Sequence, residues 1–152
     1  MDTQYQTEIQ ITLEPHYQTV IPRVFVKLDN EQRSMVLKDT ETVTFDLMLD
    51  VGQHQLSVWF ENKENSDSTT AVEIKDIAFQ GLTLNRVKWA GNYTPVYPEP
   101  WATEQRQQGI VLPEVIPGGH YLGWLGTYTL DFTVPTFTWL HQIENLGWLY
   151  TD

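Results

Sequence analysis

The residues most suited to chemistry lie in the polar segment ENKENSDS, residues 61–68, between two apolar stretches. Its candidate oxygen ligands are Glu61, Asn62, Glu64, Asn65 and Asp67. Carboxylate and amide oxygens are the ligands that Ca²⁺ takes in proteins, although the spacing does not fit an EF-hand loop. The same composition is also ordinary turn chemistry between strands. The sequence therefore predicts a loop and makes Ca²⁺ a candidate cofactor, with Glu61, Asn62, Asn65 and Asp67 as its ligands.

Aromatic side chains are the second group of candidate ligand contacts, and most of them lie in a Pro-rich stretch. The six candidates are Trp59, Tyr93, Tyr97, Trp101, Tyr121 and Trp124. Aromatic faces can stack on the C–H faces of sugar rings. The same rings can instead bury against a core to hold a long loop, or form a protein interface. We interpret the group as contacts to a ligand or a partner, and the two structural roles stay open as alternatives.

Motifs for enzymatic chemistry are missing from the sequence. There is no cysteine, and the four histidines show no metal-binding spacing. Of these, His54 follows a turn, where we expect a hydrogen-bonded structural role. No nucleophile elbow or phosphate-cradling loop is present. Glycoside hydrolysis needs two carboxylates across a cleft, and with 20 acidic residues the sequence cannot nominate a pair. We therefore expect a protein that is not an enzyme.

The elements that must position these residues are strands, because apolar residues alternate with a period of two. The inward faces of the expected strands are Ile9, Ile11 and Leu13; Val24, Val26 and Leu28; Val43, Phe45, Leu47 and Leu49; Leu56, Val58 and Phe60; Val72 and Ile74, then Ile77 and Phe79; and Tyr128, Leu130, Phe132 and Val134. The change of phase across Asp76 predicts a bulge or a bend. The sequence therefore predicts an all-β fold, a single jelly-roll-like antiparallel β-sandwich.

Residues 91–125 differ from the rest of the chain in composition. They contain five of the eight prolines, so we expect a long Pro/Gly-rich loop excursion with one short strand. After Pro135 the alternation of Phe137, Trp139 and His141 predicts a further strand. We expect Phe137, Trp148 and Tyr150 to close the sandwich against the first strands.

Length and charge limit the domain organisation and the partners. A chain of 152 residues is expected to form one domain, residues 1–152. Its formal charge of −11 repels nucleic acids and anionic membranes, so neither is an expected partner. The N-terminal MDTQYQTEIQ lacks the basic start and apolar stretch of a signal peptide, and no apolar run is long enough to span a membrane. We expect a protein made in the cytoplasm.

The run TVTFDLMLDVGQHQLSVWFENKENSDSTTAVEIKDIAFQGLTL, residues 42–84, resembles the calcium-dependent xylan-binding modules and related carbohydrate-binding domains. The positions that carry the resemblance are Gly52, His54, Leu56, Val58, Phe60 and Asn62. Lys63 stands where that family tends to place an aspartate. The resemblance implies a jelly-roll sandwich, sugar recognition and a bound calcium ion. The organisation of the chain is also similar to that of small virion proteins of tailed phages.

The sequence favours a non-enzymatic recognition or assembly module that binds a carbohydrate or a protein assembly partner. Such a module would suit a phage virion, as a fibre, decoration or adaptor component. The alternative is a purely structural protein, homo-oligomeric or attached to a capsid or tail, that uses the same aromatic residues as an interface. A small jelly-roll glycan hydrolase is the third hypothesis.

Overall fold

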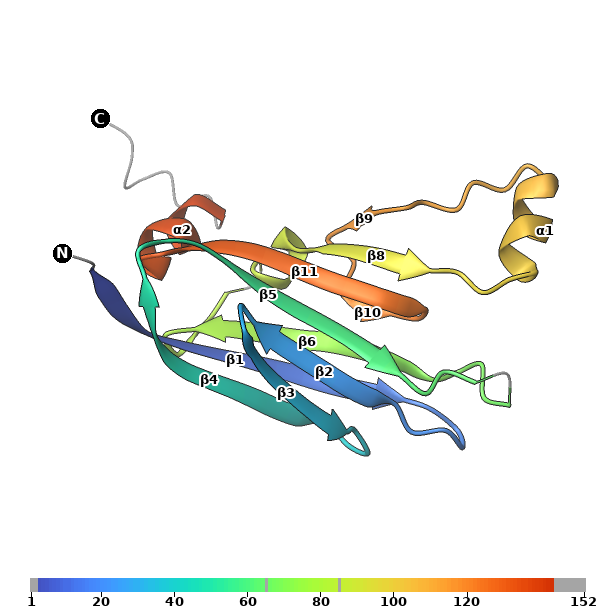
Figure 1. Cartoon of the computed structure of the whole chain (residues 1–152), viewed down its shortest axis with the longest axis horizontal. Coiled ribbons are helices and arrows are strands. Elements are labelled where there is room, and N and C mark those ends of the chain that lie inside the picture. Colours follow the sequence, from blue (N-terminus) through green and yellow to red (C-terminus); the bar gives the residue numbers. More distant parts are fainter. Residues whose placement is uncertain (1–2, 65, 85, 144–152) are drawn as a thin grey trace.

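The computed structural model describes residues 3–64, 66–84 and 86–143, which form two antiparallel β-sheets packed as a sandwich (Figure 1). Sheet A consists of β1 (Gln4–His16), β4 (Glu41–Asp50), β6 (Ala71–Phe79), β7 (Leu82–Thr83) and β10 (Tyr121–Leu122). Sheet B consists of β2 (Arg23–Leu28), β3 (Glu31–Val36), β5 (Gly52–Glu61), β8 (Asn92–Val96), β9 (Ile116–Pro117) and β11 (Leu125–Val134). The predicted antiparallel β-sandwich is confirmed, while its jelly-roll connectivity stays a prediction.

The strand order places distant parts of the sequence side by side. Sheet A has the order β10-β6-β1-β4, with β7 beside β6, and sheet B has the order β3-β2-β5-β11-β8-β9. In sheet A, Ile9 lies opposite Phe45, and in sheet B, Leu130 lies opposite Leu56. These residues all point between the sheets and are fully buried. The alternation in the sequence therefore identified the core, because successive side chains of a strand face opposite sides.

The predicted irregularity near Asp76 is a β-bulge in β6. Thr12 of β1 pairs with Asp76, whereas the next residue, Leu13, pairs with Ile74. Lys75 is thus the extra residue on the bulged strand. The bulge lets Ile74 and the following Ile77 both face the core, where each is buried.

The predicted closing strand after Pro135 is wrong, because the structure forms helix α2 (Thr136–Ile143) there. Thr136, Trp139 and Leu140 are spaced for one face of a helix, and all three are buried. Trp139 packs against Phe79 of sheet A and Phe132 of sheet B, with ring centroids 5.1 and 6.0 Å away. The helix therefore closes one end of the sandwich.

Phe137 does not close the sandwich as predicted, because it lies on the outer side of α2 with 62% of its surface exposed. On a helix, Phe137 points away from the face that Trp139 and Leu140 bury. Trp148 and Tyr150, which we also expected in the core, lie outside the described residues.

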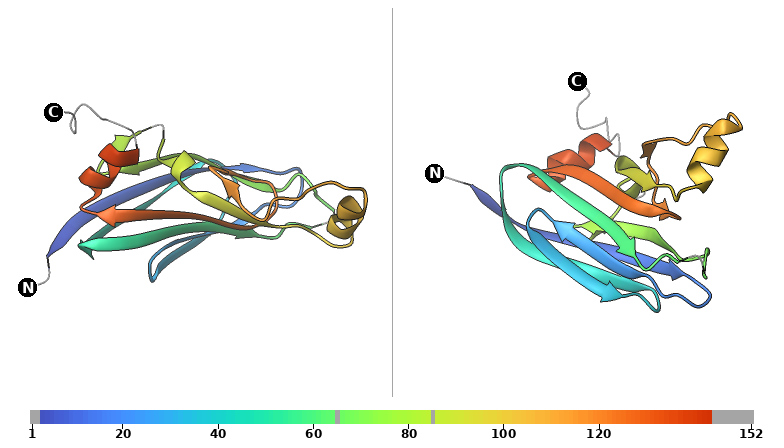
Figure 2. Two further views of the ribbon diagram at one scale, coloured as in Figure 1. Left: turned by 90° about the horizontal axis from the view of Figure 1, so that it is seen from above. Right: turned by 45° about the vertical axis from the view of Figure 1, so that its right-hand side comes forward.

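The excursion 91–125 holds more regular structure than one strand. It contains β8, β9 and β10, the short helix η1 (Lys88–Ala90) lies just before it, and helix α1 (Trp101–Gln107) lies in its middle. Residues 97–115, which we call the arm, carry α1 away from the sandwich, at the end opposite α2 (Figures 1 and 2). Proline is tolerated within β8 because β9 pairs only with Asn92 and Tyr93, so Pro95 lies on a free edge.

Candidate functional site

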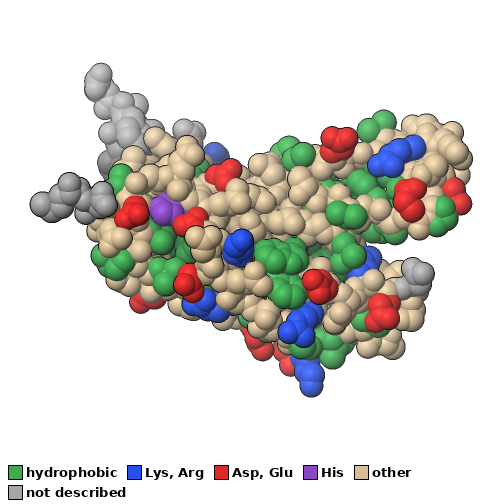
Figure 3. All heavy atoms as spheres, in the orientation of Figure 1, with side chains coloured by type: hydrophobic (Ala, Val, Ile, Leu, Met, Phe, Trp, Pro, Cys, Tyr) green, Lys and Arg blue, Asp and Glu red, His purple; other side chains and the backbone are tan. Residues whose placement is uncertain are grey.

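A cleft of 1110 Å³ lies at the end of the sandwich that carries the arm. Its walls come from the segment after β1, the β5–β6 loop, the end of β8 and the turn between β10 and β11. Figure 3 shows the surface hollowed here, between the arm and the loops below it. Ligand pockets commonly have volumes of about 300–1000 Å³ and aromatic linings, so the cleft has the size of a binding site.

Three of the predicted aromatic residues line this cleft, namely Tyr97, Tyr121 and Trp124. They come from the arm, from β10 and from the turn that follows it. Trp101, the first residue of α1, lies behind this wall, with its ring centroid 4.9 Å from that of Trp124 and 6.3 Å from that of Tyr97. The structure thus brings four of the six predicted aromatics together, three as lining and one as support.

Tyr93 does not fit the predicted role of a ligand contact, because it is buried in the core with 2% of its surface exposed. Its hydroxyl accepts a hydrogen bond of 2.9 Å from the backbone N–H of Trp124 and donates one to the carbonyl of the same residue. Burial raises the pKa of this hydroxyl, so it stays a neutral donor. Tyr93 therefore holds the backbone of Trp124 in place from behind the cleft.

Trp59 also lies away from the cleft. It is on the outer face of sheet B, where its ring stacks on that of Phe25 with centroids 5.4 Å apart and planes 5° from parallel. The two residues are directly opposite each other on β5 and β2. Cross-strand aromatic pairs of this kind stabilise a sheet. Trp59 thus lies apart from the other candidates, and its role as a ligand contact stays a prediction.

The predicted calcium loop is organised around Asp67, whose side chain is buried. One carboxylate oxygen accepts hydrogen bonds from the backbone N–H groups of Gln18, Thr19 and Val20, at 2.7–2.9 Å. The other accepts bonds from the backbone and the hydroxyl of Thr69. The hydroxyl of Thr69 and these N–H groups hold the pKa of Asp67 far below its ordinary value of 3.8. The carboxylate therefore ties the β1–β2 loop to the β5–β6 loop.

Lys63 occupies the centre of the same loop. Its ammonium donates hydrogen bonds to the carbonyls of Ser68 and Thr70, at 2.7 and 2.9 Å. Carbonyl oxygens that converge in this way are ligands a metal ion would use, and here they bind an ammonium. Of the other predicted ligands, Glu61 and Asn62 are exposed, and Asn65 lies outside the described residues. The loop is thus held by hydrogen bonds among its own groups.

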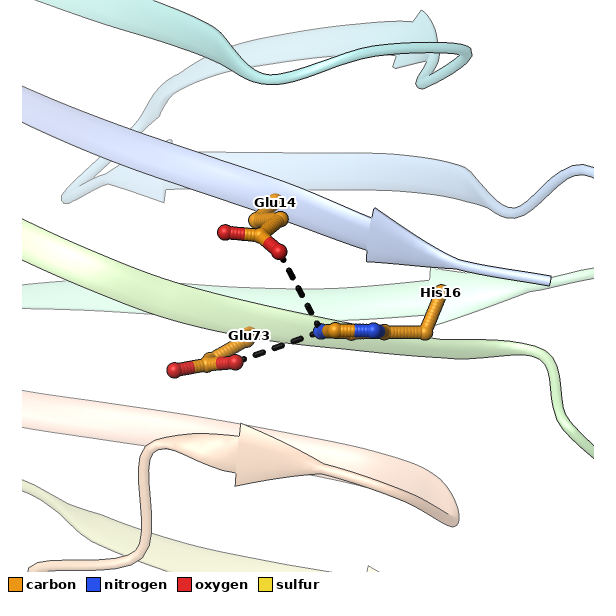
Figure 4. Close-up of side chains that lie close together, drawn as sticks. All are labelled: Glu14, His16 and Glu73. Atoms are coloured by element: carbon orange, nitrogen blue, oxygen red, sulfur yellow. Dashed lines mark hydrogen bonds and ion pairs between the residues drawn. The ribbon is translucent and has the colours of Figure 1, made fainter.

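A second group that offers ligands to a metal ion borders the cleft, and the sequence did not suggest it. His16 Nε2 lies 3.2 Å from a carboxylate oxygen of Glu73 and 3.8 Å from one of Glu14 (Figure 4). Lys75 bridges the remaining oxygens of the two glutamates, at 3.4 and 3.5 Å. Burial acts to raise the pKa of Glu73, but the hydrogen bonds from His16 and Lys75 outweigh it and lower that pKa. The glutamate oxygens that face His16 are thus different from those that Lys75 binds.

His54 has the hydrogen-bonded structural role that its position predicted. Its Nδ1 lies 2.5 Å from a carboxylate oxygen of Asp29, and its Nε2 lies 2.7 Å from the carbonyl of Asp50. Both partners are acceptors, so the protonated ring, which donates from both nitrogens, matches this environment. Burial acts to lower the pKa of His54, yet the contacts with Asp29 and Asp50 raise it overall.

Sequence reasoning missed several residues that line the cleft: His16, Tyr17, Lys38 and Lys63. Tyr17 is fixed by the hydrogen bond of 3.0 Å that its hydroxyl donates to the carbonyl of Lys38. The adjacent His16 packs its ring against that of Tyr121, 5.3 Å away. The sequence signal that could have identified these two residues is the His-Tyr pair at the end of a strand, because strand ends carry side chains to the rim of a sandwich.

None of the helices in the described part of the chain is long and apolar enough to cross a lipid bilayer. Comparison of the chain with protein-family models, with curated proteins and with solved structures finds no match.

Proposed function

We propose that this chain is a non-enzymatic recognition module that binds a carbohydrate in the aromatic cleft. The observation that carries the proposal is the convergence of Tyr97, from the arm, with Tyr121 and Trp124, from β10 and the turn after it, on one cleft of 1110 Å³. Aromatic rings bury a large apolar area and stack on the C–H faces of sugars. A cleft with aromatic walls and a few polar groups is the usual form of a small-molecule site.

The charged groups of the cleft favour binding over hydrolysis. Among the described residues that line it, Glu64 carries the one carboxylate. Glycoside hydrolysis uses two carboxyl groups on either side of the scissile bond. Glu14 and Glu73 lie nearby, but both are paired with His16 and Lys75. This arrangement supports recognition without chemistry.

The first experiment is a glycan array probed with the purified chain, followed by titration of any bound glycan. Tyr121→Ala should weaken binding about tenfold, the typical effect of removing one stacked ring. Tyr5→Ala is the matched control, because Tyr5 is also on sheet A and is 43% exposed, against 50% for Tyr121, yet does not line the cleft. An array without any bound glycan, or equal affinities of the two variants, would contradict the proposal.

The array should be run with added Ca²⁺ and again with a chelator. Loss of binding in the chelator would support the predicted calcium site in the 61–67 loop. Unchanged binding would remove calcium from the proposal. The hydrogen bonds of Asp67 and Lys63 would then hold this wall of the cleft without a metal ion.

Assembly is a second candidate function, which includes the role of a virion component, and the apolar surface of the arm favours it. Three aliphatic side chains of the arm are exposed: Ile110 by 46%, Val111 by 85% and Val115 by 47%. Exposed apolar patches on soluble proteins often mark interaction sites. Size-exclusion chromatography with light scattering tests this role. A stable oligomer that Val111→Asp dissociates would support assembly, and a monomer at all concentrations would contradict self-assembly.

A further inference from the structure

The charges that line the cleft differ from those of the chain as a whole. The chain has 20 acidic and nine basic residues. The cleft, within its described lining, has two lysines, Lys38 and Lys63, against the single carboxylate of Glu64. His16 also lines it, but its Nε2 is paired with Glu73 and Glu14. Among the charged side chains that line the cleft, lysines therefore outnumber carboxylates, although the protein as a whole is acidic.

Lys63 is held in a fixed position by the backbone. Its ammonium carries three N–H groups, and two of them donate to the carbonyls of Ser68 and Thr70. No carboxylate of the described residues lies within ion-pair distance of it, although the buried Asp67 carboxylate attracts it electrostatically. Its Nζ lies 5.8 Å from the ring centroid of Trp124. A cation with a remaining donor is thus preorganised over the ring of Trp124, in the lining of the cleft.

We infer that the ligand of the cleft is an acidic saccharide, whose carboxylate or sulfate group binds Lys63 while its ring packs against the aromatic lining of the cleft. The inference rests on the proposed function, because it names the class of carbohydrate that the same cleft binds. A charge-assisted hydrogen bond is about twice as strong as a neutral one. The acidic group would therefore determine which saccharides are bound.

The test compares saccharides that differ only in charge. An oligosaccharide of galacturonic acid is titrated against its methyl ester, which removes the negative charge and keeps the backbone. A sulfated galactan oligosaccharide is titrated against its desulfated form. We expect at least one acidic form to bind about tenfold to a hundredfold more tightly than its neutral partner, the range for one charge-assisted bond. The pair that shows the preference identifies the acidic group.

Lys63→Met should abolish this preference, because methionine keeps an unbranched apolar stem and removes the ammonium. Lys88→Met is the matched control, since the Lys88 ammonium also donates to a backbone carbonyl, that of Lys75, but lies outside the cleft. Both variants change the net charge equally. Lys63→Arg keeps the charge and should retain most of the preference.

The outcomes separate this inference from the proposed function. Equal affinity for the acidic and neutral forms would overturn the inference and leave carbohydrate recognition standing, and this comparison needs only the unmodified protein. Binding of no saccharide, here or on the glycan array, would overturn both. A preference that survives in Lys63→Met, or that Lys88→Met removes equally, would overturn the role of Lys63.

Discussion

Tyr93→Phe tests whether the buried hydroxyl behind the cleft positions Trp124. The change removes one oxygen and keeps the ring, so the packing of the core is preserved. It breaks the hydrogen bonds of that oxygen to the N–H and the carbonyl of Trp124. Each bond contributes about 1 kcal/mol net, so we expect the free energy of unfolding to fall by about 2 kcal/mol. For a chain of this size, that corresponds to a decrease of about 4–8 °C in Tm.

Tyr128→Phe is the matched control for this prediction. Tyr128 lies directly opposite Tyr93 on the neighbouring strand and is fully buried. Its hydroxyl donates a hydrogen bond of 2.7 Å to the carbonyl of Lys88 and also interacts with the backbone of Gly91, away from Trp124. We therefore expect a loss of about 1–2 kcal/mol, or about 2–8 °C in Tm, without any effect on the cleft.

Two measurements on both variants test whether the Tyr93 hydroxyl positions Trp124. Urea unfolding gives the two free energies, and tryptophan fluorescence, with and without a bound saccharide, reports on the cleft. Tyr93→Phe should shift the emission and weaken binding, whereas Tyr128→Phe should do neither. Equal destabilisation, together with an unchanged cleft in both variants, would refute the reasoning that Tyr93 positions Trp124.

Three further predictions concern the scaffold. The fold holds the pKa of His54 above its ordinary value of 6.5, so protonated His54 stabilises the protein fully below pH 6.5, and this stabilisation is lost as pH rises through the folded pKa. Urea unfolding at about pH 6 and about pH 8 should show this loss in the wild type but not in His54→Asn. A Cβ at Gly126, where φ is +137°, would lie 2.3 Å from the carbonyl oxygen of Thr94, so Gly126→Ala should lower the free energy of unfolding by about 3 kcal/mol or more. Gly109 also has a positive φ but has free space around it, so Gly109→Ala should cost about 1 kcal/mol, and equal Tm values for the two variants would contradict this prediction. Asp67→Asn should speed hydrogen exchange at the three backbone amides of the β1–β2 loop that donate to the Asp67 carboxylate. In the wild type these amides should stay protected from exchange to well below pH 3.8, because the pKa of Asp67 is depressed in the folded protein; loss of their protection near pH 4 would contradict this prediction.

The core was predictable from the sequence because a period of two is a direct consequence of strand geometry. Ile9 and Leu130 were placed correctly for this reason, and the change of phase at Asp76 located the bulge. Helix α2 was missed because its eight residues satisfy both periods: Phe137 and Trp139 alternate, but Trp139 and Leu140 also share a helical face. In so short a segment, the choice between helix and strand depends on packing against the two sheets, which the local spacing of apolar residues does not reveal.

The candidate site was predictable only in part. Tyr97, Tyr121 and Trp124 were identified because they are aromatic residues of a Pro-rich segment. Tyr93 lies in the same segment but in strand β8, and its burial depends on pairing with β11. Lys63 was considered only because it stands where the xylan-binding modules tend to place an aspartate. Its contacts with two carbonyls follow from the closure of its loop, which no spacing in the sequence reveals.

The position of β11 determines when the protein can fold during synthesis. Within the residues that the structure describes, this strand is the last one, yet it lies inside sheet B, between β5 and β8. A nascent chain that ends before residue 125 therefore exposes the edges of both neighbours, and edges of this kind are prone to pair with other chains. The cleft needs segments from Pro15 to Leu125, so it forms only with this last pairing. Such long-range pairing makes folding slow, and we expect ligand binding to appear in a single late step, once β11 has left the ribosome.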